Sequence, residues 1–113
     1  MKINCEETLR HVIVRLSGGV DMSAGAEFRE SPFIGSHSND LILDLSEVDF
    51  MDSAGLAALV LIIRAQKAAG KKCVLASPTP IVAKILKITA IHQLAPIEPS
   101  VESAIQLLRG DAL

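Results

Sequence analysis

A serine lies beside an aspartate at the predicted start of a strongly apolar helix. Asp52 and Ser53 follow an apolar run (residues 41–45) and an acidic turn, and Gly55 comes two positions later. The first backbone N–H groups of a helix have no partner within the helix, and they attract anions. A serine hydroxyl placed there can cap the helix, act as a nucleophile, or be modified by another protein.

The rest of the sequence gives little support for catalysis by Ser53. A nucleophilic serine needs a positioned base and donors for an oxyanion. His11, His37 and His92 fall in a predicted strand, a polar loop and a late turn, so spacing assembles no triad. Neither G-x-S-x-G nor the phosphate-binding G-x-x-x-x-G-K-[ST] occurs. We therefore do not expect Ser53 to act as a nucleophile, and we predict no metal or other cofactor. Capping, the commoner role of such a serine, and modification both stay open.

Composition excludes several classes of function. The 113 residues carry a formal net charge of −2 and include no Trp or Tyr, so neither a basic surface nor an aromatic platform for nucleic acid is expected. Cys5 and Cys73 lie in apolar, strand-like runs, which favours buried free thiols. Residues 1–10 do not resemble a signal peptide, and the longest apolar run (55–63) is too short to cross a bilayer. These features predict a cytoplasmic protein without nucleic-acid partners or direct membrane insertion.

Apolar periodicity predicts strands that alternate with helices in a single domain over residues 1–113. Strands are expected at 3–5, 11–17, 41–45, 73–76 and 94–97, and helices at 21–30, 53–69, 80–88 and 101–110. The first two strands should form a hairpin, whereas the later alternation predicts parallel neighbours. The expected fold is therefore an α/β domain with a mixed sheet of four to five strands and about four helices.

The predicted helix 53–69 is apolar on two sides. One stripe should face the sheet, and its members are Leu56, Leu59, Val60 and Ile63. The opposite side carries a smooth strip with almost no charge, formed by Ala57, Ala58, Leu61, Ala65 and Ala68. Either neighbouring helices or a partner protein should cover this strip.

A longer pattern around Ser53 resembles a family signature. Residues 43–56 read L-D-L-S-x-V-x-F-M-D-S-x-G-L, which is similar to the signature of the STAS domain, found in anti-sigma factor antagonists and sulfate transporters. Further similarity at 16–21, 71–76 and 98–104 extends the resemblance over nearly the whole chain. The resemblance implies a mixed sheet with helices packed mainly on one face.

The resemblance also implies a partner switch. In such antagonists the serine directly after the signature aspartate is phosphorylated, and that residue is Ser53 in this chain. An anti-sigma factor with serine kinase activity adds the phosphate, and a separate phosphatase removes it. Only the unphosphorylated antagonist binds the anti-sigma factor and releases the sigma factor. The resemblance thus implies a kinase substrate that is not itself an enzyme. The expected partners are such a kinase and its phosphatase, and we also allow for a weak homodimer.

The partner-binding residues are expected to surround the acceptor. They are Asp21, Met22, Met51, Asp52, Ala54, Gly55 and Leu56. Several of them have an ordinary structural alternative. Asp52 can be a plain helix cap, Gly55 can satisfy a turn or packing requirement, and Asp21 can be a solvated loop charge. The two methionines and Leu56 can fill the core.

A second function fits the same resemblance. Small free-standing STAS-like proteins resemble subunits of ABC-type lipid-transport complexes, in which the predicted helix 53–69 would contact an ATPase and Ser53 would be a passive contact. The apolar strip on that helix is the sequence feature that bears on this alternative.

Overall fold

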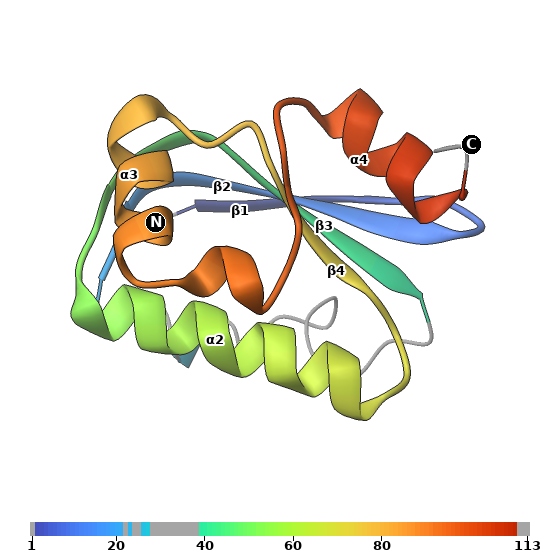
Figure 1. Cartoon of the computed structure of the whole chain (residues 1–113), viewed down its shortest axis with the longest axis horizontal. Helices are drawn as coiled ribbons and strands as arrows, with labels where there is room; N and C mark the ends of the chain where they lie inside the picture. Colours follow the sequence, from blue (N-terminus) through green and yellow to red (C-terminus); the bar gives the residue numbers. More distant parts are fainter. Residues whose placement is uncertain (1, 22, 24–25, 28–38, 111–113) are drawn as a thin grey trace.

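The computed structural model describes residues 2–21, 23, 26–27 and 39–110. Within them, one five-stranded sheet is combined with three α-helices and a short 3-10 helix (Figure 1). The elements are β1 (Lys2–Glu7), β2 (His11–Val20), β3 (Asp40–Met51), α2 (Ser53–Ala68), β4 (Cys73–Ala76), α3 (Pro80–Ile88), η1 (Ile91–Gln93), β5 (Ile97–Glu98) and α4 (Val101–Leu108). The predicted α/β class with a mixed sheet is confirmed. The helix predicted over 21–30 lies mostly outside the described residues.

The sheet is mixed because its first connection is a tight turn and the later ones are crossovers. The strand order is β1-β2-β3-β4-β5; β1 and β2 are antiparallel, and β2 to β5 are parallel. The Thr8 side chain stabilises the turn, because its Oγ1 donates to the His11 carbonyl (3.0 Å) and accepts from the His11 N–H (3.1 Å). Parallel strands all end at the same edge of a sheet, so β2 to β5 deliver their following residues to one end of the molecule.

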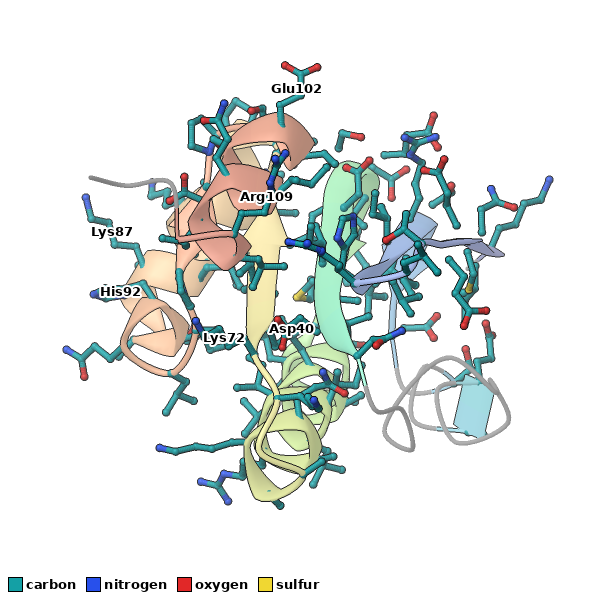
Figure 2. The ribbon with its side chains drawn as sticks, turned by 90° about the vertical axis from the view of Figure 1, so that its right-hand side faces the viewer. Asp40, Lys72, Lys87, His92, Glu102 and Arg109 are labelled. Atoms are coloured by element: carbon teal, nitrogen blue, oxygen red, sulfur yellow. The ribbon has the colours of Figure 1, made fainter. Side chains whose placement is uncertain are left out.

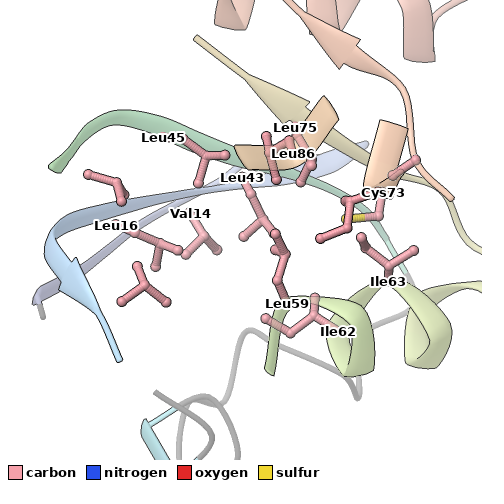
Figure 3. Packing of buried hydrophobic residues seen from close by; sticks show 14 of the residues in the cluster. Val14, Leu16, Leu43, Leu45, Leu59, Ile62, Ile63, Cys73, Leu75 and Leu86 are labelled. Atoms are coloured by element: carbon pink, nitrogen blue, oxygen red, sulfur yellow. The ribbon is translucent and has the colours of Figure 1, made fainter. Parts of the chain in front are cut away.

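Helices cover the two faces of the sheet unequally. α2 and α3 pack on one face and α4 on the other. Alternation along the strands separates the two cores, since Val12 and Val14 point toward α2 and α3 while Ile13 points toward α4. Branched aliphatic side chains from the strands and α2 fill the larger core (Figure 3). Helix packing mainly on one face is thus confirmed for α2 and α3, and α4 occupies the second face.

The buried face of α2 is rotated by about one residue from the prediction. Its buried residues are Gly55, Ala58, Leu59, Ile62, Ile63 and Gln66. Leu56 and Val60, expected to face the sheet, are only partly buried, and Ala58, expected on the far strip, is buried. The reason is that Gly55 packs directly against the Val20 backbone of β2, where a Cβ would not fit, and this contact turns the helix toward that side. Of the predicted far strip, Ala57, Leu61 and Ala68 are exposed.

A buried glutamine links the far end of α2 to the sheet. Gln66 is only 2% exposed, and its amide nitrogen donates to the carbonyls of Asn39 (3.2 Å) and Lys72 (3.1 Å). The Lys72 N–H in turn donates to the Asp40 carboxylate at 2.9 Å. These bonds join the starts of β3 and β4 to α2. Apolar periodicity gave no indication of this polar side chain in the core.

Two predicted strand boundaries are wrong. β3 continues six residues beyond the predicted end at 45, because it keeps pairing with β2 through two irregular steps in register. The last strand begins at Ile97 rather than 94, since η1 precedes it. Both cysteines are free thiols, as predicted, although Cys5 is only partly buried. Burial raises the pKa of the Cys73 thiol to about 12.

Candidate functional site

The ends of β2 and β3 bring two acidic residues and a serine to one edge of the sheet. Val20 is paired with Met51 in the ladder, and the Asp52 N–H donates to the Val20 carbonyl at 3.2 Å. Asp21 follows Val20, whereas Asp52 and Ser53 follow Met51. The two segments therefore leave the sheet side by side, because neighbouring strands lie about 4.8 Å apart. The two loops that carry the predicted site residues do converge.

Asp52, not Ser53, caps α2. Asp52 has extended backbone angles (φ −96°, ψ −177°), and its carboxylate accepts the Gly55 N–H at 2.8 Å. An N-cap residue must be extended, whereas Ser53 is already the first helical residue. The capping role considered for Ser53 is therefore wrong, and the alternative role of Asp52 as a helix cap is confirmed.

The Ser53 hydroxyl is available at the start of the helix. The residue is exposed, and its side chain forms no hydrogen bond with the part of the chain that the structure describes. By helix geometry the N–H groups of Ser53 and Ala54 point out from the first turn. That turn contains no acidic side chain. An anion attached at Ser53 would meet peptide N–H groups, with Asp52 and Asp21 as the nearby opposing charges.

Gly55 is required by packing inside the molecule. A Cβ atom at this position would lie 2.0 Å from the Val20 carbonyl oxygen and 2.7 Å from the Val20 carbonyl carbon. No side chain fits between the first turn of α2 and the end of β2. The packing alternative for Gly55 is thus supported, and this close approach holds Ser53 beside Asp21.

The remaining predicted contact residues divide into surface and core. Ala54 is exposed, and Leu56 is partly buried against the core. Met51 is only 4% exposed and fills the core, because its side chain points toward α2 and α3. Met51, like the buried Gly55, therefore offers no side-chain surface to a partner. Met22 lies outside the described residues.

Asp21 contributes a fixed negative charge to this edge. Its carboxylate accepts hydrogen bonds from the Ser23 hydroxyl (2.8 Å) and the Ser23 N–H (3.0 Å). These two bonds hold the pKa of Asp21 below its ordinary value. Asp21 is therefore ionised at neutral pH, and it would repel a second anion at Ser53.

Two residues of this edge were missed by sequence reasoning. Phe50 is 53% exposed and is paired with Gly19 in the ladder, which leaves a large apolar side chain on the surface at this end of the sheet. Alternation could not identify it, because the end of β3 is irregular and both Val48 and Met51, three residues apart, are buried. Thr79 donates its hydroxyl to the Val48 carbonyl at 3.2 Å, which joins the extended end of β3 to the start of α3. Nothing in the local sequence indicated that contact.

Neither a metal-binding cluster nor a membrane-spanning helix occurs in the part of the chain that the structure describes. Across residues 2–21, 23, 26–27 and 39–110, no group of three or more His, Cys, Asp or Glu side chains could hold a metal ion. Over the same ranges, every helix is too short or too polar to cross a membrane.

Comparisons with known proteins identify the family and the fold. The family model of the STAS domain matches residues 2–104. The structure of the anti-sigma factor antagonist SpoIIAA in its unphosphorylated form superimposes with a TM-score of 0.79. The two sequences are 26% identical, and the match covers 96% of this chain and 97% of that one. A Thermotoga maritima protein described as a candidate anti-sigma factor antagonist has a TM-score of 0.86 at 21% identity (95% and 94% covered). The STAS domain of a SulP transporter from Vibrio cholerae has a TM-score of 0.75 at 23% identity (94% and 86% covered).

Proposed function

Because the chain belongs to the STAS domain family, we propose that it is an anti-sigma factor antagonist switched by phosphorylation of Ser53. The unphosphorylated form binds an anti-sigma factor that is also its serine kinase, and a phosphatase restores it. The observation that carries this proposal is the exposed Ser53 hydroxyl at the start of α2, with the capping role taken by Asp52. The protein is then a cytoplasmic regulator and a kinase substrate, not an enzyme.

The fold should tolerate a phosphate at Ser53. The helix N-terminus favours the anion by roughly 0.3–2 kcal/mol. Asp21 and Asp52 oppose it, and a pair of unit charges about 6 Å apart costs roughly 0.7–2.8 kcal/mol for effective dielectric constants of 80 down to 20. The two effects nearly cancel, so phosphorylation should change the free energy of unfolding little.

Binding should not tolerate the phosphate. The modification adds roughly 1.5 to 2 negative charges at neutral pH. A dianion pressed against a surface built for a neutral hydroxyl loses solvation worth several kcal/mol. The neighbouring carboxylates of Asp21 and Asp52 give no compensation. A loss of about 3 kcal/mol corresponds to more than a hundredfold weaker affinity.

The acceptor lies at one end of an apolar surface. Steps of four residues, with a last step of three, place Ser53 in line with four apolar residues of α2. We call these four residues, Ala57, Leu61, Ala65 and Ala68, the α2 strip. Leu61 is 61% exposed, and Ala57 and Ala68 are also exposed. A partner that covers the α2 strip would also contact Ser53. This arrangement explains how one phosphate could control an interface much larger than itself.

Affinity capture from native extract tests the proposal. Unmodified protein and the Ser53→Ala variant should both retain a kinase, whereas Ser53→Asp should lose it. The control is Gln106→Glu, which adds one negative charge at an exposed position of α4, on the other face of the sheet. If Ser53→Asp retains the kinase as well as wild type does, the proposal fails.

The length of the α2 strip favours one second candidate, a STAS subunit of an ABC-type lipid-transport complex. The strip continues four turns past Ser53 to Ala68, so a partner can dock on α2 without depending on the serine. Capture of an ATPase that is lost in Leu61→Asp but kept in Ser53→Asp would decide for this candidate. Capture of a kinase lost in both variants would decide against it.

A further inference from the structure

One edge of the sheet is long and unpaired among the described residues. β5, at one edge, has two residues, whereas β1, at the other, has six. Figure 2 shows the molecule from the side where β3 begins, with β1 at one side of the sheet, beyond β2 and β3. An exposed edge strand offers its free N–H and C=O groups to another strand.

The register of the hairpin identifies which backbone groups are free. The Thr8 N–H donates to the His11 carbonyl at 2.9 Å, and the ladder continues from Glu7↔Val12 to Lys2↔Ser17. Inward and outward hydrogen bonding alternates along an antiparallel strand. The N–H and C=O groups of even-numbered β1 residues therefore point to β2. Those of Ile3, Cys5 and Glu7 point to the open edge.

We propose that β1 pairs antiparallel with β1 of a second copy of this chain, with the two-fold axis passing through Asn4. In this register Ile3 and the partner's Cys5 exchange two backbone hydrogen bonds, and the symmetric pair exchanges two more. The two five-stranded sheets then join into one continuous sheet. The contact is isologous, so it closes at a dimer.

Charge selects this register. On the α4 face of the sheet, Lys2 lies opposite the partner's Glu6. On the α2 face, Ile3 lies opposite the partner's Cys5, and the two-fold axis repeats each pair once. Opposite charges and apolar pairs directly across two strands stabilise their pairing. A register centred on Cys5 would instead set Ile3 opposite the partner's Glu7. That places an apolar side chain against a charge and leaves Lys2 without an acid directly opposite.

A charge exchange tests the pairing, measured by sedimentation of purified protein over a concentration series. Wild type should show a monomer–dimer equilibrium. Lys2→Glu and Glu6→Lys should each weaken dimerisation at least about tenfold, since both symmetric pairs become repulsive. The double variant Lys2→Glu/Glu6→Lys should recover wild-type dimerisation. A wild-type protein that stays monomeric, or a double variant no better than the single ones, overturns the proposal.

Cross-linking tests the register itself. Across the two-fold axis, the Cα atoms of Asn4 and the partner's Asn4 would lie about 4.5 Å apart, within reach of a disulfide. Asn4→Cys combined with Cys5→Val should form a covalent dimer under mild oxidation, while wild type should not. Cys73 is buried and stays unreactive. In the register centred on Cys5, wild type would cross-link and the Asn4→Cys variant would not, and that result refutes the proposed pairing.

Discussion

Replacing Gly55 by alanine tests the geometry that positions Ser53, the proposed phosphate acceptor. The added Cβ would lie 2.0 Å from the Val20 carbonyl oxygen, 2.7 Å from its carbonyl carbon and 3.0 Å from its Cγ1. Two of these three atoms belong to the backbone, so no side-chain rotation relieves the contact. The first turn of α2 must move away from β2 by roughly 1 Å or more to restore ordinary van der Waals separation.

The cost of Gly55→Ala follows from two losses and one gain. Overpacking of this kind costs about 1–3 kcal/mol. The displacement also weakens the hydrogen bond from the Asp52 N–H to the Val20 carbonyl (3.2 Å), a bond worth about 0.5–1.5 kcal/mol. Alanine returns roughly 0.5–1 kcal/mol because it prefers a helix over glycine. The net loss of unfolding free energy should be about 1–3 kcal/mol, or roughly 4–12 °C in Tm for a chain of this size.

Thermal and urea-induced unfolding measure this loss. The matched control is Gly19→Ala, because a Cβ at Gly19 would meet only the Phe50 side chain, at 3.4 and 3.9 Å. That control should stay within about 0.5 kcal/mol of wild type. Equal stability of the Gly55→Ala and Gly19→Ala proteins would refute the close approach of α2 to β2. Placement of Ser53 beside Asp21 would then lose its physical basis.

Three further predictions concern stability and its dependence on pH. Asp52→Ala should lower the free energy of unfolding by about 1 kcal/mol, because it removes the cap of α2, whereas Ser53→Ala should lower it by less than about 0.5 kcal/mol. Equal losses for the two variants in urea titrations would contradict the capping assignment. Gln66→Leu should cost about 0.5–1.5 kcal/mol, because the Asn39 carbonyl loses its amide donor, whereas the Lys72 carbonyl keeps the Leu41 N–H (2.9 Å); unchanged stability would show that water replaces the amide. Burial alone would raise the pKa of Asp44, but hydrogen bonds from the Arg15 guanidinium (2.8 Å) and from Ser46 hold it below its ordinary value. A lowered native pKa stabilises the fold above the unfolded value of about 3.9, and this contribution is lost as the pH falls through the native pKa. Arg15→Ala should therefore lower the free energy of unfolding by about 1 kcal/mol at pH 7, and its difference from wild type should shrink in acid. A difference in unfolding free energy that stays constant down to about pH 2 would argue against the ion pair.

The order of the elements was accessible from sequence because apolar patterns report which faces are buried. Alternation in residues 11–17 predicted β2, and Pro80 marked the start of α3 correctly. The two strand boundaries failed where long-range pairing decides them. β3 extends to Met51 only because β2 lies beside it, and no local pattern in residues 46–51 reports that neighbour.

The position of the candidate site at the start of α2 was accessible from sequence, but the roles of its residues were not all accessible. Aspartate and serine are both good N-cap residues, so local sequence could not choose between Asp52 and Ser53. The choice is made by β2, whose Val20 carbonyl holds the Asp52 N–H and keeps Asp52 extended. The same strand explains why the buried face of α2 begins at Gly55 instead of Leu56. Both outcomes depend on contacts between residues more than thirty positions apart in the chain.

The most direct test compares fully Ser53-phosphorylated protein with unmodified protein in two measurements on the same samples. Titration calorimetry with the captured anti-sigma kinase should show an affinity at least about a hundredfold lower for the phosphorylated form. Thermal unfolding should show Tm values within about 4 °C of each other, which corresponds to a change below roughly 1 kcal/mol. Equal affinities, or a phosphorylated protein that no longer folds, would contradict a phosphate that blocks docking and spares the fold.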